Sequence, residues 1–489
     1  MSQNIFQGSF FPSSQAIITG GSFIINNNKQ VPGTAKGTCF FSILIARFNS
    51  KDLIIDGYER LLDFVAPNAL YDSGHIVDPP KCHPGTRVAI IETIMDWIAG
   101  LQEVTRRKHI TWLTGGAGAG KSAIGRTVCE RCAEEGALLA SFFFGSNDST
   151  RNHSRSLIAT IAYQICAISP SLRKAVSDFI DYDPLIFTRS LRKQFSSLVI
   201  EPLATNYANE PQKIPPLIVL DGLDECLDPA TQREILETLL YAVTSSLIPL
   251  RVLVCSRPES NIAQSFSAVE MGKTVFKIFV GDVYSSYDDI RLYLWDNFKR
   301  IREGHMFKAS IPPSWPSEEA VEKLIERSSG QFIYASTVIY YIESSRYRPH
   351  QRLDAVLGLR PPFKDLPFSE LDALYTHLLK STDDPSLTTD ILAFLSLYGS
   401  VRPKDIDIYL GLEAGQAELV LIDVAAIVRM KMDEPNDVCE AFLLHKSFED
   451  FLFDSYRSKE LSKSRADTRV SHIIRAIQMF PGEYYPHMF

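Results

Sequence analysis

The sequence predicts an α/β protein whose parallel sheet carries helices on both faces and is followed by a helical region and a winged-helix region. Three observations support this prediction. Short apolar runs alternate with helical patterns between residues 110 and 255, which is typical of a parallel sheet. Strand patterns stop near residue 282, and helical spacing takes over. Two short strand patterns at 429–444 then predict a hairpin among short helices.

The first 55 residues are the least informative part of the chain. Residues 17–28 mix β-branched residues, glycines and a run of asparagines. This composition favours a poorly ordered leader. The alternative is a strand-forming segment that stacks with copies of itself.

Residues 56–105 are predicted to form a linker and a lead-in helix. A helical pattern at 53–65 is followed by a proline-rich connector at 78–87. An amphipathic helix at 88–101 then has its isoleucines on one face. It leads directly into the next strand.

The segment 115–122 carries the strongest chemical signal. It reads Gly-Gly-Ala-Gly-Ala-Gly-Lys-Ser and fits G-x-x-x-x-G-K-[ST]. An apolar strand at 110–113 precedes it, and a helix from Ser122 to Gly136 follows, so a chance glycine-rich turn is the weaker interpretation. Glycines let backbone N–H groups approach phosphate oxygens, Lys121 would reach the β and γ phosphates, and the Ser122 hydroxyl would hold Mg²⁺.

The predicted cofactors are therefore ATP or ADP with Mg²⁺. The nucleotide-binding residues expected from this loop are Gly115, Gly116, Ala117, Gly118, Ala119, Gly120, Lys121, Ser122 and Ala123.

The nucleotide-binding domain is expected to span residues 106–281. Its remaining strands are predicted at 137–144, 217–220 and 251–255. Its helices are predicted at 154–168, from Pro170 with Ser169 as N-cap, from Thr188, and from Pro229 to Leu247.

A carboxylate cluster follows the strand at 217–220. Asp221 ends that strand, where a carboxylate suits Mg²⁺ binding beside a phosphate loop. Asp224 and Glu225 are candidates for the group that polarises the attacking water, and Glu225 is the first choice. A strand that simply ends in a charged turn is the alternative.

Arg257 follows the next predicted strand. Ligands of open parallel sheets bind at the carboxyl ends of strands, so its guanidinium could sense the γ-phosphate. An ordinary surface arginine in a loop is the alternative.

Together, 115–122, 217–225 with its Asp-Gly-Leu-Asp-Glu ending, and Ser256-Arg257-Pro258 resemble a NACHT-type domain of the fungal set. This domain belongs to the signal-transduction ATPases with numerous domains, the STAND class, which includes NOD-like receptors. Softer similarities lie at 82–87, 140–144, 157–164, 329–335 and 444–452. The resemblance covers about residues 60 to 456. It implies a helical domain at 282–360 and a winged helix at 361–456, and a tail at 457–489 follows.

The resemblance implies a molecular switch in signal transduction, of the innate-immunity or heterokaryon-incompatibility kind. It would be closed with ADP, open with ATP, and reset by slow hydrolysis. It implies adenine contacts near Arg87, contacts from Gly330 and Phe332, and a winged-helix histidine, His445, on the diphosphate. For His445, an ordinary structural histidine is an equally weighted alternative.

Composition adds weaker expectations about location and partners. The formal net charge is −8, and no basic domain stands out, so nucleic acid is an unlikely partner. The apolar run at 39–46 is too short for a membrane span. We therefore expect a cytoplasmic protein with no membrane partner, which binds nucleotide, forms a homo-oligomer with ATP and acts on an unknown effector.

Three further functions compete with the switch. They are a catalytic ATPase or P-loop kinase, a DNA-handling ATPase that uses the winged helix, and a truncated family member that does not signal. A kinase would need an acceptor site and an arginine-rich lid, and the sequence suggests neither.

Overall fold

The fold is that of a computed structural model, in which residues 1–54 and 55–489 form two separate units. The structure describes residues 6–11, 14–19, 22–26, 56–74, 80–146, 148–209, 215–245, 248–280, 285–358, 368–433 and 438–479. The apolar run at 39–46, the expected domain boundary at 360–361 and the last ten residues of the tail lie outside this part.

The first unit contains three strands, β1 (Phe6–Phe11), β2 (Ser14–Thr19) and β3 (Ser22–Asn26). They pair antiparallel with β2 in the middle. The strands β2 and β3 contain β-branched isoleucines, which favour extended backbone, and the expected poorly ordered leader stays a prediction. Stacking with copies of itself stays a prediction.

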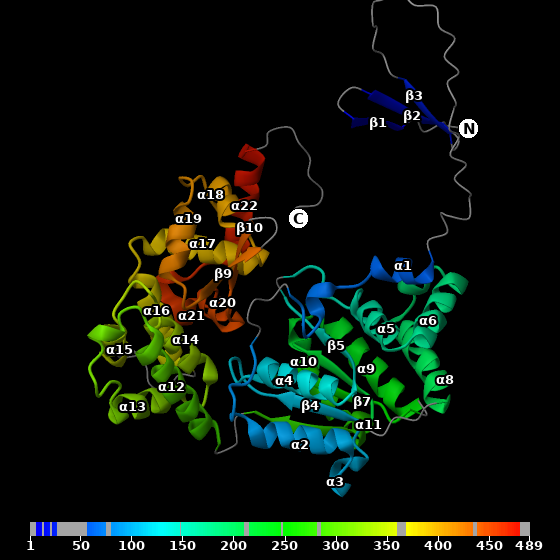
Figure 1. The fold of residues 1–489 in the computed structure, drawn as a ribbon, viewed down its shortest axis with the longest axis horizontal. Helices are drawn as coiled ribbons and strands as arrows, with labels where there is room; N and C mark the ends of the chain where they lie inside the picture. The colour runs from blue at the N-terminus through cyan, green and yellow to red at the C-terminus, as the bar shows by residue number, and fades with distance from the viewer. Residues whose placement is uncertain are drawn as a thin grey trace, which may run out of the picture. The chain divides into compact units, whose positions relative to one another are not determined.

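A five-stranded parallel sheet forms the centre of the second unit (Figure 1). Its strands are β4 (Ile110–Thr114), β5 (Leu138–Phe143), β6 (Leu217–Asp221), β7 (Arg251–Ser256) and β8 (Val275–Phe279). The order across the sheet is β5-β6-β7-β4-β8. The carboxyl ends of β4, β6 and β7 therefore meet at one edge.

Alternating side chains bury both faces of this sheet. On β6, Ile218 and Leu220 join the core on one face, whereas Leu217 and Val219 join the core on the other. Helices α5, α6 and α9 cover the first face, and α2 and α4 cover the second (Figure 1). Burial on two sides is why these strands read as continuous apolar runs.

The helices of this domain follow the predicted pattern closely. Ser169 caps α6 by accepting a hydrogen bond from the backbone N–H of Leu172 at 3.3 Å, as predicted. The helices are α1 (Gly57–Leu62), α2 (Val88–Ala99), α3 (Glu103–Arg106), α4 (Lys121–Glu134), α5 (Leu157–Ile168), α6 (Pro170–Tyr182), α7 (Leu191–Phe195), α8 (Glu201–Asn209), α9 (Pro229–Ser245), α10 (Ser260–Ser267) and α11 (Val269–Thr274).

The fifth strand, β8, is absent from the sequence-based expectation. It pairs with β4 alone, at the edge of the sheet. Its residues are only partly buried or exposed, and Lys277 lies in its middle. Edge strands commonly carry such charges, so its pattern is weaker than that of the four buried strands.

The rest of the second unit is mainly helical and has its own core. The predicted hairpin is present as β9 (Val428–Asp433) and β10 (Val438–Leu443), and Val401 forms a further bridge to Ala441. The helices are α12 (Ser285–Gly304), α13 (Glu318–Ser328), α14 (Phe332–Ile342), α15 (Pro349–Gly358), α16 (Ser369–Lys380), α17 (Pro385–Tyr398), α18 (Pro403–Leu410), α19 (Gln416–Asp423), α20 (Lys446–Leu452), α21 (Ser455–Ser458) and α22 (Arg465–Met479).

None of the helices in the described ranges is long and apolar enough to cross a lipid bilayer.

Candidate functional site

A cavity of about 470 Å³ lies at the carboxyl edge of the sheet. Three regions of the second unit line it: the phosphate loop with the ends of β6 and β7, the connector before α2, and Tyr293 of α12 with residues of α14 and the start of α20. Its volume is in the usual range for a small-molecule site. From the predicted loop, the residues that line it are Ala117, Gly118, Gly120, Lys121, Ser122 and Ala123.

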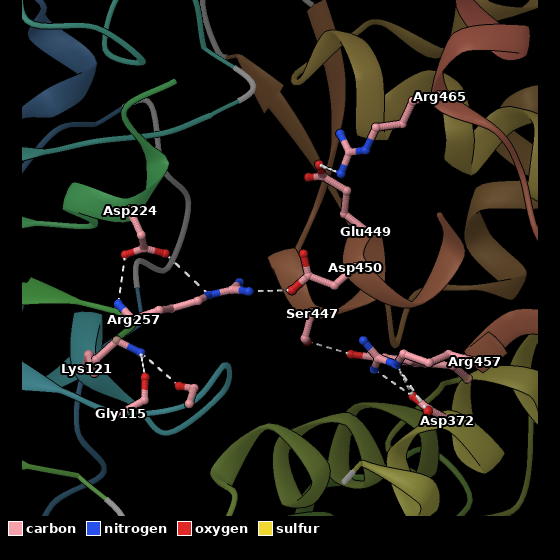
Figure 2. A network of polar contacts seen from close by, with 12 residues as sticks. Gly115, Lys121, Asp224, Arg257, Asp372, Ser447, Glu449, Asp450, Arg457 and Arg465 are labelled. Carbon is pink, nitrogen blue, oxygen red and sulfur yellow. Dashed lines mark hydrogen bonds and ion pairs between the residues drawn. The ribbon is translucent and has the colours of Figure 1, made fainter. Parts of the chain in front are cut away.

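Lys121 is held over the loop from which it projects. Its Nζ donates hydrogen bonds to the carbonyl oxygens of Gly115 and Gly116, each at 2.8 Å (Figure 2). Burial lowers the pKa of Lys121, while Asp224 and Asp221 act in the opposite direction. Among the described residues the partly buried ammonium donates hydrogen bonds to neutral carbonyls alone, and an anion that entered the cavity would interact strongly with it.

Two glycines of the loop are required by close contacts. A Cβ on Gly115 would lie 2.6 Å from the carbonyl oxygen of Val280. Gly118 has φ +70°, and a Cβ there would lie 2.2 Å from Cγ2 of Ile333 on α14. The loop is thus packed directly against the helical region, which the motif alone does not indicate.

Asp221 and Ser122 have the chemistry of a magnesium site. The Asp221 carboxylate accepts a hydrogen bond from the Ser122 hydroxyl, and its Oδ1 is buried with no hydrogen-bond partner among the described residues. Burial raises the pKa of Asp221 to about 6. Since Mg²⁺ prefers oxygen ligands and would favour the ionised carboxylate, these two residues fit the predicted metal role.

This pKa gives a testable pH dependence. Only the ionised carboxylate holds Mg²⁺, so protonation through a pKa of about 6 should weaken Mg²⁺ binding as the pH falls. Between about pH 7.5 and about pH 5.5 the apparent affinity of the nucleotide-loaded protein should drop about fourfold. A Mg²⁺ titration followed by calorimetry measures this.

The control for that titration is Asp221→Asn, which removes this carboxylate and keeps the other titrating groups, including Glu225 and the nucleotide. The difference between the two pH profiles isolates the carboxylate. Identical profiles would exclude Asp221 as a metal ligand.

The two candidates for the water-polarising group differ in their surroundings. Asp224 is occupied: its Oδ1 accepts a hydrogen bond from the backbone N–H of Arg257 at 3.0 Å, and its Oδ2 lies 3.4 Å from Arg257 Nε. Among the described residues, Glu225 accepts a hydrogen bond from the Ser146 N–H at 3.1 Å. Burial raises the pKa of Glu225, while Lys446 opposes this effect. Glu225, the first choice from sequence, stays the proposed base.

Arg257 lies at the end of β7, as predicted, but its partners are unexpected. Besides Asp224, its guanidinium donates a 2.7 Å hydrogen bond to Asp450 Oδ2 on α20 (Figure 2). It is therefore no free surface arginine. The proposed role toward a γ-phosphate requires it to exchange one of these partners.

Arg87 lies at the cavity, but protein groups occupy its guanidinium. It donates to the carbonyl oxygen of Ala119 at 3.0 Å and to Ser286 Oγ at 2.9 Å, and it lies 4.8 Å from the centre of the Phe332 ring. The residue ties the phosphate loop to α12 and α14. An adenine contact by Arg87 itself stays a prediction.

Of the two residues expected from α14 and the turn before it, one lines the cavity. Phe332 does, together with its neighbour Ile333. Gly330, with φ +77°, belongs to the turn between α13 and α14 and is not part of the lining. Its role is therefore to let the chain turn, because glycine adopts positive φ without strain.

His445 borders the same cavity as the phosphate loop. It immediately precedes α20 and lines the same cavity as Lys121. Its Nε2 is shielded from solvent and has no hydrogen-bond partner among the described residues. Burial lowers the pKa of His445 to about 4, so the ring is neutral near pH 7 and retains one N–H donor.

Sequence reasoning missed three residues that the structure brings to the site. Ile333 contacts Gly118, Lys446 lies near Glu225, and Asp450 pairs with Arg257. Lys446 and Asp450 are four residues apart on one helix, so they share a face. That spacing was the available signal, and the resemblance implied that the neighbouring His445 contacts the nucleotide, but neither indicated that Lys446 and Asp450 approach Glu225 and Arg257.

The strand order, the glycine loop that enters α4 and the buried Asp221 at the end of β6, which β7 separates from β4, define a P-loop NTPase fold. The fold predicted from the sequence is thereby confirmed.

The comparison with protein families adds a more particular likeness. The family model described as "Nephrocystin 3, N-terminal" matches residues 90–257. This stretch holds the phosphate loop, Asp221 and Arg257, but it is less than half of the chain, so the chain is similar to that family over its nucleotide-binding domain alone. No curated protein matches the chain.

Solved structures with similar folds are distant. The Walker-type ATPase PABY2304 of Pyrococcus abyssi is 16% identical, covers 74% of this chain and 95% of its own, and has a TM-score of 0.39. The Aeropyrum pernix ORC2 protein, solved as ADPNP–ADP complexes, is 13% identical, with 84% and 98% covered and a TM-score of 0.37. The Aeropyrum pernix ORC1 protein in complex with DNA is 14% identical, with 80% and 95% covered and a TM-score of 0.33. Scores this low carry no argument about function.

Proposed function

We propose that the protein is a nucleotide-binding switch of the NACHT type that takes ATP and ADP with Mg²⁺ and resets by slow hydrolysis. One observation carries the proposal: the cavity at the phosphate loop is lined on its other side by α14 and by the start of α20. A nucleotide bound there would contact the helical and winged-helix regions as well as the sheet. Its exchange could therefore alter how these regions pack, as a switch requires.

The electrostatics of the cavity support a polyphosphate as the ligand. Lys121 and Arg257 supply positive charge, and the loop supplies backbone N–H groups at the start of α4. Asp221 and Ser122 supply oxygen ligands for the metal that would accompany the phosphates. When bound, Mg²⁺ would neutralise charge on the phosphate oxygens, while Glu225 would orient and deprotonate the attacking water.

A single experiment separates the switch from its alternatives. The purified chain is analysed for bound nucleotide. The molecular mass of its assembly in solution is measured with ADP and with ATP. Its rate of ATP hydrolysis is measured with and without duplex DNA. A switch should retain ADP, increase in mass with ATP, and turn over slowly whether or not DNA is present.

The other outcomes identify the competing functions. Stimulation of turnover by DNA would favour a DNA-handling ATPase. Rapid turnover at constant mass would favour a catalytic ATPase, and bound nucleotide without any change in mass would favour a family member that does not signal.

A prediction concerns His445, which would donate one hydrogen bond to a diphosphate oxygen across the cavity. His445→Ala removes this donor and should speed ADP release roughly tenfold, because a hydrogen bond to a charged group contributes about 1.5–3 kcal/mol. Stopped-flow measurement of ADP dissociation tests this, alongside a melting curve without nucleotide.

His472→Ala provides the matched control. His472 is also buried, bonds to the Tyr398 hydroxyl at 3.1 Å, and does not line the cavity. It should lower the melting temperature and leave ADP release unchanged. If His445→Ala behaved in the same way, His445 would be a packing residue.

A further inference from the structure

Arg257 connects the end of β7 to α20 by ionic contacts. Its Nε lies 3.4 Å from Asp224 Oδ2, and a terminal nitrogen donates to Asp450 Oδ2 at 2.7 Å (Figure 2). The guanidinium thus bridges two carboxylates that lie 226 residues apart in the chain. Both carboxylates raise the pKa of Arg257 against the effect of its burial, so the group stays a cation.

The two carboxylates do not hold Arg257 equally. Asp224 also accepts the backbone N–H of Arg257, and only 5% of its side chain is exposed. Asp450 accepts a hydrogen bond from the side chain of Arg257, and 27% of its side chain is exposed. Asp224 is therefore a fixed partner of Arg257, since the two residues follow the neighbouring strands β6 and β7. Asp450 is held less firmly, so a phosphate can take its place on the guanidinium.

The charges around the site make that replacement depend on the ligand. Arg257 lines the cavity near Lys121, whereas Asp450 does not line it. A terminal phosphate that bound Arg257 would bring negative charge close to Asp224, Glu225 and Asp450 together. Because like charges at short range repel in a partly desolvated site, the least fixed carboxylate would leave.

We propose that Asp450 is a positioning residue that makes the nucleotide site discriminate between triphosphate and diphosphate. It holds Arg257 when no terminal phosphate is present, and a triphosphate must displace it to bind the guanidinium. A diphosphate leaves the pair intact. Displacement frees α20 from the end of β7, which links the identity of the nucleotide to the packing of the winged-helix region. The inference rests on the proposed nucleotide-binding function.

The test compares ligand affinities of the full chain with those of Asp450→Asn. The variant keeps the shape of the side chain but removes the charge that competes for Arg257. Its affinity for the β,γ-imido analogue of ATP should rise about fivefold, since partly exposed ion pairs contribute modestly, and its affinity for ADP should not change. Calorimetry measures both values.

Two further variants show whether the effect acts through Arg257. Adding Arg257→Gln to Asp450→Asn should abolish the gain for the triphosphate analogue, because the two substitutions remove one interaction. Asp423→Asn is the matched control: Asp423 pairs with Arg346, its side chain is 24% exposed, and neither residue lines the cavity. It should change neither affinity.

A measurement without nucleotide completes the test. Amide hydrogen exchange in α20 should be faster in Asp450→Asn than in the unaltered chain, because α20 has lost its bond to β7. Asp423→Asn should leave the exchange in α20 unchanged.

The outcomes separate failure of the inference from failure of the proposed function. If the unaltered chain bound both ligands and Asp450→Asn shifted neither, or shifted both equally, Asp450 would not discriminate between them, and only the inference would fail. If the unaltered chain bound neither nucleotide, both would fail. A gain for the triphosphate analogue that persisted with Arg257→Gln would also contradict the inference.

Discussion

Glu225→Gln should slow ATP hydrolysis by a factor of about a hundred or more while leaving nucleotide affinity nearly unchanged. Burial raises the pKa of Glu225, which makes its carboxylate a better proton acceptor than an exposed one. Its side chain is oriented by the N–H of Ser146 at 3.1 Å. Glutamine preserves the shape of this side chain but cannot take a proton from water.

Single-turnover hydrolysis with enzyme in excess measures the chemical step without product release. Glu259→Gln is the matched control, because Glu259 belongs to the same group of charges near Asp224 and Lys446 but is exposed. It should hydrolyse at nearly the rate of the unaltered protein. If Glu225→Gln did so too, Glu225 would not be the base, and the occupied Asp224 would have to be reconsidered.

Lys121→Ala should weaken the binding of ATP and ADP roughly tenfold to a hundredfold. The ammonium is partly buried, and among the described residues it donates to the carbonyls of Gly115 and Gly116, so its charge is not neutralised by those contacts. Charge-assisted hydrogen bonds to phosphate contribute about 1.5–3 kcal/mol. Fluorescence titration with a labelled nucleotide measures the loss.

Lys108→Ala is the matched control. It tests whether the loss of any lysine that donates to backbone carbonyls lowers nucleotide affinity. Lys108 also donates to two backbone carbonyls, those of Gly272 and Lys273, at 3.0 and 2.8 Å, but it does not line the cavity. Its replacement should leave nucleotide affinity unchanged. Equal affinities for the unaltered chain and for Lys121→Ala would exclude the assignment of the phosphate loop.

Local pattern was sufficient for the centre of the fold because the physical causes are local. Strands β4, β5, β6 and β7 are buried on both faces and therefore appear as uninterrupted apolar runs, and the N-cap of α6 needs only Ser169 and Pro170. Strand β8 does not appear as an uninterrupted apolar run, because it lies at the edge of the sheet and has Lys277 in its middle. The position of a strand in its sheet depends on distant segments.

The same distinction applies to the candidate site. The sequence by itself determined Gly115, Lys121, Ser122 and Asp221 as a group, since glycine conformation, phosphate charge and metal preference impose their spacing along one loop and one strand end. Only the tertiary structure decided that Arg257 pairs with Asp224 and Asp450 and that Arg87 bonds to the phosphate loop.

These contacts join segments separated by up to about two hundred residues, and their geometry depends on how whole regions pack. No periodicity or spacing within either segment records that packing. The residues of the phosphate loop can therefore be predicted from local sequence, whereas the contact of Arg257 with Asp450 of the winged-helix region forms only when the chain folds.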